Sequence, residues 1–139
     1  MSRSTCARLA LLAVAALAIG GAFELARAGH TGDVSLLTVR ADYVKRLLDA
    51  REPMLLVDFR KPAEYRAGHL PGAISLPITE LDRRFQEIPP IARAVLYCQC
   101  PLEEIATAYT FLWNQGYRNH IVLEDGFDGW LRRQYPIAK

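Results

Sequence analysis

Two short apolar runs that each lead into a polar side chain constrain the fold of this 139-residue chain more than any other feature. Residues 54–57 lead into Asp58, and residues 94–97 lead into Cys98. Continuous apolar runs of this length are typical of strands buried on both faces of a parallel sheet. Helical spacing follows the second run, with apolar side chains at Ile105, Ala108, Tyr109, Leu112 and Trp113.

Strand-like and helix-like segments alternate along the chain, which favours an α/β fold. Strands are expected at residues 36–37, 54–58, 73–76, 94–97 and 121–123. Helices are expected at residues 41–49, at 62–67, from 79 toward 85, from shortly after Cys98 up to 115, and at 127–133. This alternation implies βα crossovers and a central, mainly parallel five-stranded sheet with helices on both faces. Ligands bind outside the carboxyl ends of such strands, so the placement of Asp58 and Cys98 favours a functional cysteine.

The N-terminal segment has the form of a secretory signal. Arg3 and Arg8 precede an apolar stretch over residues 9–23, and Ala26-Arg27-Ala28 resembles a cleavage site. The stretch is shorter than the roughly 20 residues of a membrane span, so a cleaved signal over residues 1–28 is favoured over an uncleaved anchor. In both cases the folded part is expected to be exported, to the periplasm or another extracytoplasmic space. A membrane contact would then run only through the apolar stretch.

The remaining chain divides into a short linker over residues 29–35 and a single domain over residues 36–138. Without the signal it carries 14 basic and 14 acidic residues, so no basic stripe is left to indicate nucleic acid as a partner. Cys98 and Cys100 are its cysteines, and one residue separates them. They are therefore reactive, buried or locally paired, and they form neither a disulfide framework nor a zinc site. No cofactor or metal is indicated.

Three sequence blocks, in this order, resemble the rhodanese (sulfurtransferase) family over about residues 36–136. Val57-Asp58-Phe59-Arg60, with the following Gly68-His69-Leu70-Pro71-Gly72-Ala73, is similar to the N-terminal signature of the family. Val95-Leu96-Tyr97-Cys98 resembles its active-site strand, and Gly126-Phe127-Asp128-Gly129-Trp130 resembles its C-terminal Gly-x-x-x-Trp element. The resemblance implies a single-domain, exported member with the rhodanese-like three-layer α/β sandwich.

The resemblance also implies a chemistry for Cys98. In this family the cysteine takes sulfane sulfur from a donor as a persulfide and passes it to a thiophilic acceptor. That reaction needs a thiolate nucleophile and a cradle of N–H groups, which a strand end facing a helix N-terminus supplies. Two further residues are expected to support the site. Asp58 either caps the turn after its strand or sets the surroundings of Cys98, and Arg60 either pairs with a carboxylate such as Glu64 or holds an anion at the mouth.

The active-site loop departs from the pattern of thiosulfate-using members, whose loops are small, contain glycine and end in arginine. Its residues are Gln99, Cys100, Pro101, Leu102, Glu103 and Glu104, without a glycine or a basic side chain. The glutamates would repel a dianion, so a polysulfide, a protein persulfide or a small thiol is expected as the donor, with a thiol as acceptor. Cys100 either packs against the strand end or acts as a resolving thiol that pairs with Cys98.

Two other functions stay open. The chain is alternatively a non-catalytic rhodanese module that binds a partner or senses redox state through Cys98 and Cys100. Phosphatase or arsenate reductase chemistry is the third and weakest interpretation, because oxyanion binding there would require an arginine in the loop.

Cleavage of the N-terminal segment can be tested directly. When the full chain is expressed in a bacterium that exports proteins, N-terminal sequencing of the recovered protein is expected to begin at Gly29. A protein that keeps residues 9–23 would contradict the cleaved signal and favour the anchor.

Overall fold

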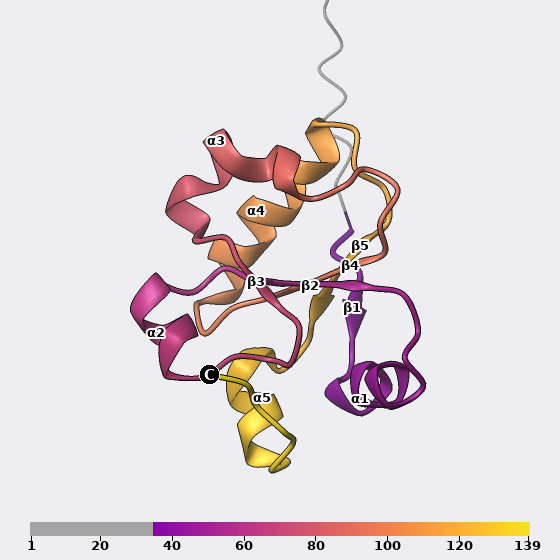
Figure 1. The fold of residues 1–139 in the computed structure, drawn as a ribbon. Helices are drawn as coiled ribbons and strands as arrows, with labels where there is room; N and C mark the ends of the chain where they lie inside the picture. The colour runs from indigo at the N-terminus through magenta and orange to yellow at the C-terminus, as the bar shows by residue number, and fades with distance from the viewer. Residues whose placement is uncertain (1–34) are drawn as a thin grey trace, which may run out of the picture. The chain divides into compact units, whose positions relative to one another are not determined.

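Five parallel strands form the centre of the computed structural model, which describes residues 35–139 (Figure 1). Their order across the sheet is β1-β5-β4-β2-β3, and every neighbouring pair is parallel. The strands are β1 (Thr38–Val39), β2 (Leu55–Asp58), β3 (Ile74–Ser75), β4 (Ala94–Tyr97) and β5 (His120–Leu123). The carboxyl ends of β2 and β4 therefore lie side by side in the middle of the sheet.

Helices cover both faces of this sheet, which confirms the three-layer α/β fold expected from the sequence. Their bounds are α1 (Ala41–Asp49), α2 (Pro62–Ala67), α3 (Leu81–Arg84), α4 (Leu102–Asn114) and α5 (Gly126–Arg132), with 3-10 turns η1 (Ile78–Glu80) and η2 (Phe85–Glu87) around α3. Buried residues of α1 and α5 share one core cluster, and those of α3 and α4 share the other.

The register of β2 and β4 explains why their sequences are continuously apolar. Leu56 pairs with Val95, and both side chains belong to the core on the α1 and α5 side. Val57 pairs with Leu96, and both belong to the core on the α3 and α4 side. Because successive side chains of a strand point to opposite faces, a strand covered on both faces needs an apolar residue at every position.

The edge strand was expected two residues too early. The structure places β1 at Thr38–Val39 and not at residues 36–37, although the carbonyl of Leu37 already accepts a hydrogen bond from the N–H of Val122. An edge strand pairs on one side only, so its ends depend on the partner strand more than on its own apolar pattern. The predicted signal segment and most of the predicted linker lie outside the described residues. Within residues 35–139 there is no helix of the length and apolarity needed to cross a membrane.

His120, the first residue of β5, is a buried titratable group within the core. Its side chain is 2% exposed, and its Nε2 lies 3.1 Å from the carbonyl oxygen of Tyr109. A carbonyl only accepts hydrogen bonds, so Nε2 carries the proton of the neutral ring. Its Nδ1 is buried without a partner among the described residues. Burial lowers the pKa of His120, the hydrogen bond to Tyr109 acts in the opposite direction, and the charge of Arg118 lowers the pKa further.

This lowered pKa predicts a loss of stability in mild acid. Below about pH 6.5, where an unperturbed histidine ionises, the unfolded chain binds a proton that the folded protein resists. The free energy of unfolding is therefore expected to fall as the pH drops below that value, until the lower pKa of the folded state is reached. Urea unfolding between pH 7.5 and pH 5 measures this slope. His120→Gln is expected to flatten it, and an equal slope in the two proteins would contradict the assignment.

Candidate active site

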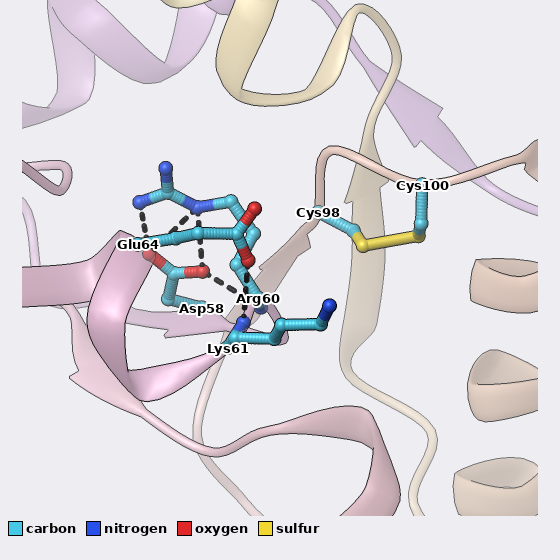
Figure 2. The surroundings of a disulfide bond; sticks show 6 residues. All are labelled: Asp58, Arg60, Lys61, Glu64, Cys98 and Cys100. Carbon is cyan, nitrogen blue, oxygen red and sulfur yellow. Dashed lines mark hydrogen bonds and ion pairs between the residues drawn. A yellow bond between two sulfur atoms is a disulfide. The ribbon is translucent and has the colours of Figure 1, made fainter.

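Cys98 and Cys100 lie at the carboxyl end of β4 and are joined by a disulfide (Figure 2). Their Cα atoms are 5.4 Å apart. Cys98 is 7% exposed and belongs to the core on the α4 side, and the half-buried Cys100 packs against the same core. The sequence left open whether Cys100 packs against the strand end or pairs with Cys98, and in the structure it does both.

The loop from Cys98 to Pro101 connects β4 directly to α4. Pro101 is the N-cap, so α4 begins at Leu102 and its first turn carries the exposed Glu103 and Glu104. In the part of the chain that the structure describes, the backbone N–H groups of Gln99, Cys100 and Leu102 donate to no backbone oxygen. Unpaired donors at the positive end of a helix dipole favour a nearby anion.

The start of α5 holds the backbone of Cys98 in place. The carbonyl oxygen of Cys98 accepts a hydrogen bond of 3.0 Å from the N–H of Phe127. Gly126 adopts a left-handed conformation, with φ of +56°, and a Cβ atom there would overlap the same carbonyl oxygen. The side chain of Gln99 adds a second link, because its Nε2 donates to Asp128 Oδ1 at 2.8 Å. The glycine of the Gly-x-x-x-Trp element is therefore required by a close backbone approach to the cysteine.

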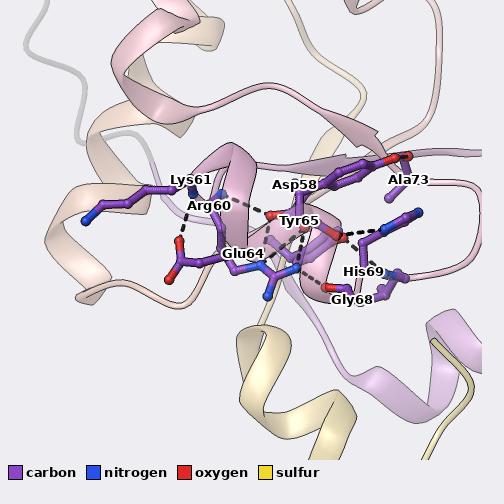
Figure 3. A network of polar contacts seen from close by, with 10 residues as sticks. Asp58, Arg60, Lys61, Glu64, Tyr65, Gly68, His69 and Ala73 are labelled. Atoms are coloured by element: carbon purple, nitrogen blue, oxygen red, sulfur yellow. Dashed lines mark hydrogen bonds and ion pairs between the residues drawn. The ribbon is translucent and has the colours of Figure 1, made fainter. Parts of the chain in front are cut away.

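Asp58 caps the turn after β2 and forms a buried ion pair with Arg60 (Figure 3). Its Oδ1 accepts from the Arg60 backbone N–H at 2.9 Å, and its Oδ2 accepts from Arg60 Nη2 at 2.6 Å. Both side chains are almost completely buried, at 0% and 4% exposure. Arg60 thus pairs with a carboxylate as expected, but the carboxylate is Asp58 and not Glu64, because Glu64 accepts a hydrogen bond from the Lys61 N–H at the start of α2.

Arg60 connects this ion pair to the cysteine through packing. Its Nη2 donates to the carbonyl oxygen of Gly68 at 2.7 Å, and its guanidinium carbon lies 3.6 Å from the ring centroid of Phe127. Burial alone would lower the pKa of Arg60, but the hydrogen bond and charge of Asp58 outweigh it and raise that pKa. Arg60 therefore remains charged. It stacks on Phe127, whose N–H donates to Cys98, and its guanidinium turns away from the disulfide (Figure 2).

Two pockets meet at the disulfide. The larger, with a volume of about 450 Å³, has Glu124, Asp125 and Asp128 among its lining residues and no lysine or arginine. We call it the acidic pocket. The smaller, of about 220 Å³, is lined by Arg60, Lys61, Glu64 and Glu104 among others. We call it the Lys61 pocket. Cys98 and Cys100 belong to both linings, although Cys98 itself is only 7% exposed.

Lys61 is the site residue that the sequence did not reveal. It is exposed at the N-cap of α2, and Figure 2 draws its side chain on the side of the disulfide. Because the loop after Cys98 has no basic residue, Lys61 is the exposed cation in the lining of the smaller pocket. In the sequence, the position of Lys61 three residues after Asp58 indicates the same edge of the sheet. Only the folded β2–α2 turn shows that Lys61 lines this pocket.

His69 has a structural environment. Its ring stacks on Tyr65 with centroids 3.8 Å apart, and its Nδ1 lies 3.0 Å from the carbonyl oxygen of the same residue. It lines neither of the two pockets at the disulfide. Across residues 35–139, no group of three or more His, Cys, Asp or Glu side chains is arranged to hold a metal ion.

Comparisons with known proteins agree with this geometry. The chain matches the rhodanese-like domain family over residues 40–133. A sulfurtransferase of Allochromatium vinosum is 38% identical over 94 residues, which cover 68% of this chain and 86% of the relative. The thiosulfate sulfurtransferase GlpE of Haemophilus influenzae is 30% identical over 83 residues, covering 60% and 78%. The crystal structure of the Alr3790 protein from Anabaena matches 72% of this chain and 81% of its own, with a TM-score of 0.66 and 25% identity.

The parallel sheet, the cysteine at the end of β4 and these relatives define an α/β protein of the rhodanese-like class, whose named relatives include sulfurtransferases. The chain belongs to the rhodanese family.

The contact between Gly126 and Cys98 predicts an unequal cost for two glycine substitutions. Gly126→Ala places a Cβ atom on the Cys98 carbonyl and is expected to lower the free energy of unfolding by about 3 kcal/mol. Gly116→Ala is the matched control, because Gly116 also has a positive φ, of +93°, but nothing lies within 4 Å of its Cβ position. The control is expected to cost about 1–2 kcal/mol from backbone strain alone. Urea unfolding measures both, and equal costs would contradict the contact.

Proposed function

We propose that this protein is a sulfurtransferase that carries sulfane sulfur as a persulfide on Cys98 and passes it to a thiol acceptor. The observation that carries the proposal is the placement of Cys98. It lies at the carboxyl end of the central strand, bordered by two pockets and by backbone N–H groups without backbone acceptors. A nucleophilic thiolate requires this combination of access and positive potential.

The proposed reaction has two displacement steps. The Cys98 thiolate attacks the outer sulfur of a donor persulfide or polysulfide, a sulfur–sulfur bond forms to Cys98, and the rest of the donor leaves as a thiolate or shorter polysulfide. An acceptor thiolate then attacks the outer sulfur, and Cys98 leaves as a thiolate. Each step exchanges one sulfur–sulfur bond for another, so no external oxidant or reductant is needed.

Sulfur uptake requires the reduced protein. In the disulfide form, Cys98 has no thiolate to attack a donor. A reductant that opens the Cys98–Cys100 bond therefore activates the protein.

The charges around the sulfur atoms favour donors of low negative charge. The acidic pocket contributes the carboxylates of Glu124 and Asp128, beside that of Asp125, which pairs with Arg133 at 2.8 Å. Lys61 shares its own pocket with two further carboxylates, those of Glu64 and Glu104. A dianion such as thiosulfate is repelled more strongly here than a monoanionic persulfide. We therefore propose a small persulfide or a protein persulfide as the natural donor, and export of the folded domain remains part of this proposal.

The disulfide itself favours one second candidate. A rhodanese module that senses redox state through Cys98 and Cys100 would use the same bond as its signal, without turnover of sulfur.

Sulfur loading separates these two functions. The full chain is reduced, freed of reductant under anaerobic conditions, and incubated with cysteine persulfide or thiosulfate. Because the N-terminal segment contains a third cysteine, every protein in this test carries Cys6→Ser. Intact mass is expected to show a gain of one cyanide-labile sulfur in Cys100→Ser with the persulfide, a smaller gain with thiosulfate, and none in Cys98→Ser. Failure of Cys100→Ser to gain sulfur from either donor would contradict the sulfurtransferase and favour the sensor.

A further inference from the structure

We infer that Cys100 resolves the persulfide on Cys98 and releases its sulfur as hydrosulfide. This activity rests on the proposed function, since it uses the same Cys98 persulfide. It differs from sulfur transfer in its product, because the sulfane sulfur is reduced and no acceptor thiol receives it. The protein would then act as a persulfide reductase whose own two cysteines supply the electrons.

The disulfide identifies Cys100 as the group that reaches the reacting atom. A resolving thiol must approach the inner sulfur of the persulfide, which is Cys98 Sγ, and the structure bonds Cys100 Sγ to that atom. Cys98 is held by the Phe127 N–H and cannot easily move away. Cys100 is on a loop whose neighbouring Gln99 is anchored to Asp128. The two sulfur atoms therefore meet without rearrangement of the sheet or of α4.

The attack of Cys100 on the Cys98 persulfide needs no electrons from outside the protein. The Cys100 thiol loses its proton to solvent, and its thiolate attacks Cys98 Sγ. A bond forms between the two Sγ atoms, and the bond from Cys98 Sγ to the outer sulfur breaks. The outer sulfur keeps its hydrogen, takes the bonding electron pair and leaves as hydrosulfide. The two cysteines lose two electrons in total, and the sulfane sulfur gains them.

A dithiol reductant would return the protein to its starting state. One thiolate of the dithiol attacks the Cys98–Cys100 disulfide, the second closes the disulfide of the reductant, and both cysteines become thiols again. The sulfur atoms are open to such a reagent through the two pockets that border them. A full cycle therefore consumes one persulfide and one dithiol.

The bridge is poorly suited to a structural role, which supports this chemical one. It joins residues separated by only two positions and closes a very short loop. A cross-link stabilises a protein mainly by restricting the unfolded chain, and the effect shrinks as the loop becomes shorter. Both cysteines also lie on one connection between β4 and α4, so the bridge ties no distant parts of the domain together.

A single-turnover experiment tests the inference. The reduced full chain and its Cys100→Ser and Cys98→Ser variants, all with Cys6→Ser, are mixed anaerobically with one equivalent of glutathione persulfide. Hydrosulfide is measured over time, and intact mass is taken before and after cyanide. With Cys100 present, we expect about one equivalent of hydrosulfide and a protein two hydrogens lighter than the reduced chain. The cyanide-labile sulfur is expected to disappear at least about tenfold faster than in Cys100→Ser, because the attack is intramolecular.

Each outcome separates the two proposals. If Cys100→Ser and the protein with both cysteines hold sulfur equally long and release no hydrosulfide above that of Cys98→Ser, Cys98 carries sulfur but Cys100 does not resolve it. If the disulfide forms without hydrosulfide, the resolving step is also wrong. If Cys100→Ser gains no sulfur at all, the proposed sulfurtransferase function itself fails. A destabilised Cys100→Ser protein is recognised by its urea unfolding curve, and Cys100→Ala then replaces it.

Discussion

The buried ion pair between Asp58 and Arg60 is the interaction on which the rest of this site depends. Arg60 donates hydrogen bonds to the Asp58 carboxylate and to the carbonyl of Gly68, and its guanidinium lies over the ring of Phe127. It thereby joins the end of β2, the end of α2 and the start of α5. A charge this deeply buried is tolerated only when it is paired and hydrogen-bonded, and removing one partner leaves the other uncompensated. Residues of the first and third sequence blocks thus meet at Arg60.

The contacts of Arg60 with Phe127 help to fix the position of the Cys98 backbone. The N–H of Phe127 donates to the carbonyl oxygen of Cys98, and Gly126 lets the backbone of α5 approach that oxygen closely because it has no Cβ atom. The backbone of Cys98 is consequently held in place, and two pockets border its side chain. In the proposed function, the Cys98 sulfur accepts a donor's sulfur when it is reduced and is blocked when it is bonded to Cys100. The position of Cys98 and its disulfide with Cys100 therefore characterise this site, whereas the loop after Cys98 contains no basic residue.

The sequence predicted the fold well because β2 and β4 are buried on both faces, which leaves a continuous apolar signal at Leu55–Val57 and Ala94–Tyr97. It also placed Cys98 at a strand end. It could not predict the partner of Arg60, since Asp58 and Glu64 are both close in sequence and only the turn after β2 selects between them. Lys61 was missed for the same reason: its place in the pocket depends on how α2 begins. Long-range contacts such as Phe127 with Cys98 have no local signature.

The most direct test compares sulfur uptake by the two redox forms of the same protein. The full chain with Cys6→Ser is prepared once with the Cys98–Cys100 bond intact and once after reduction by a dithiol that is then removed. Both samples receive glutathione persulfide, and the sulfur bound at Cys98 is located by mass spectrometry of the peptide that contains it. We predict that only the reduced sample carries sulfur on Cys98 or releases the hydrosulfide derived from it. Equal uptake by the two forms, or uptake at a residue other than Cys98, would contradict it.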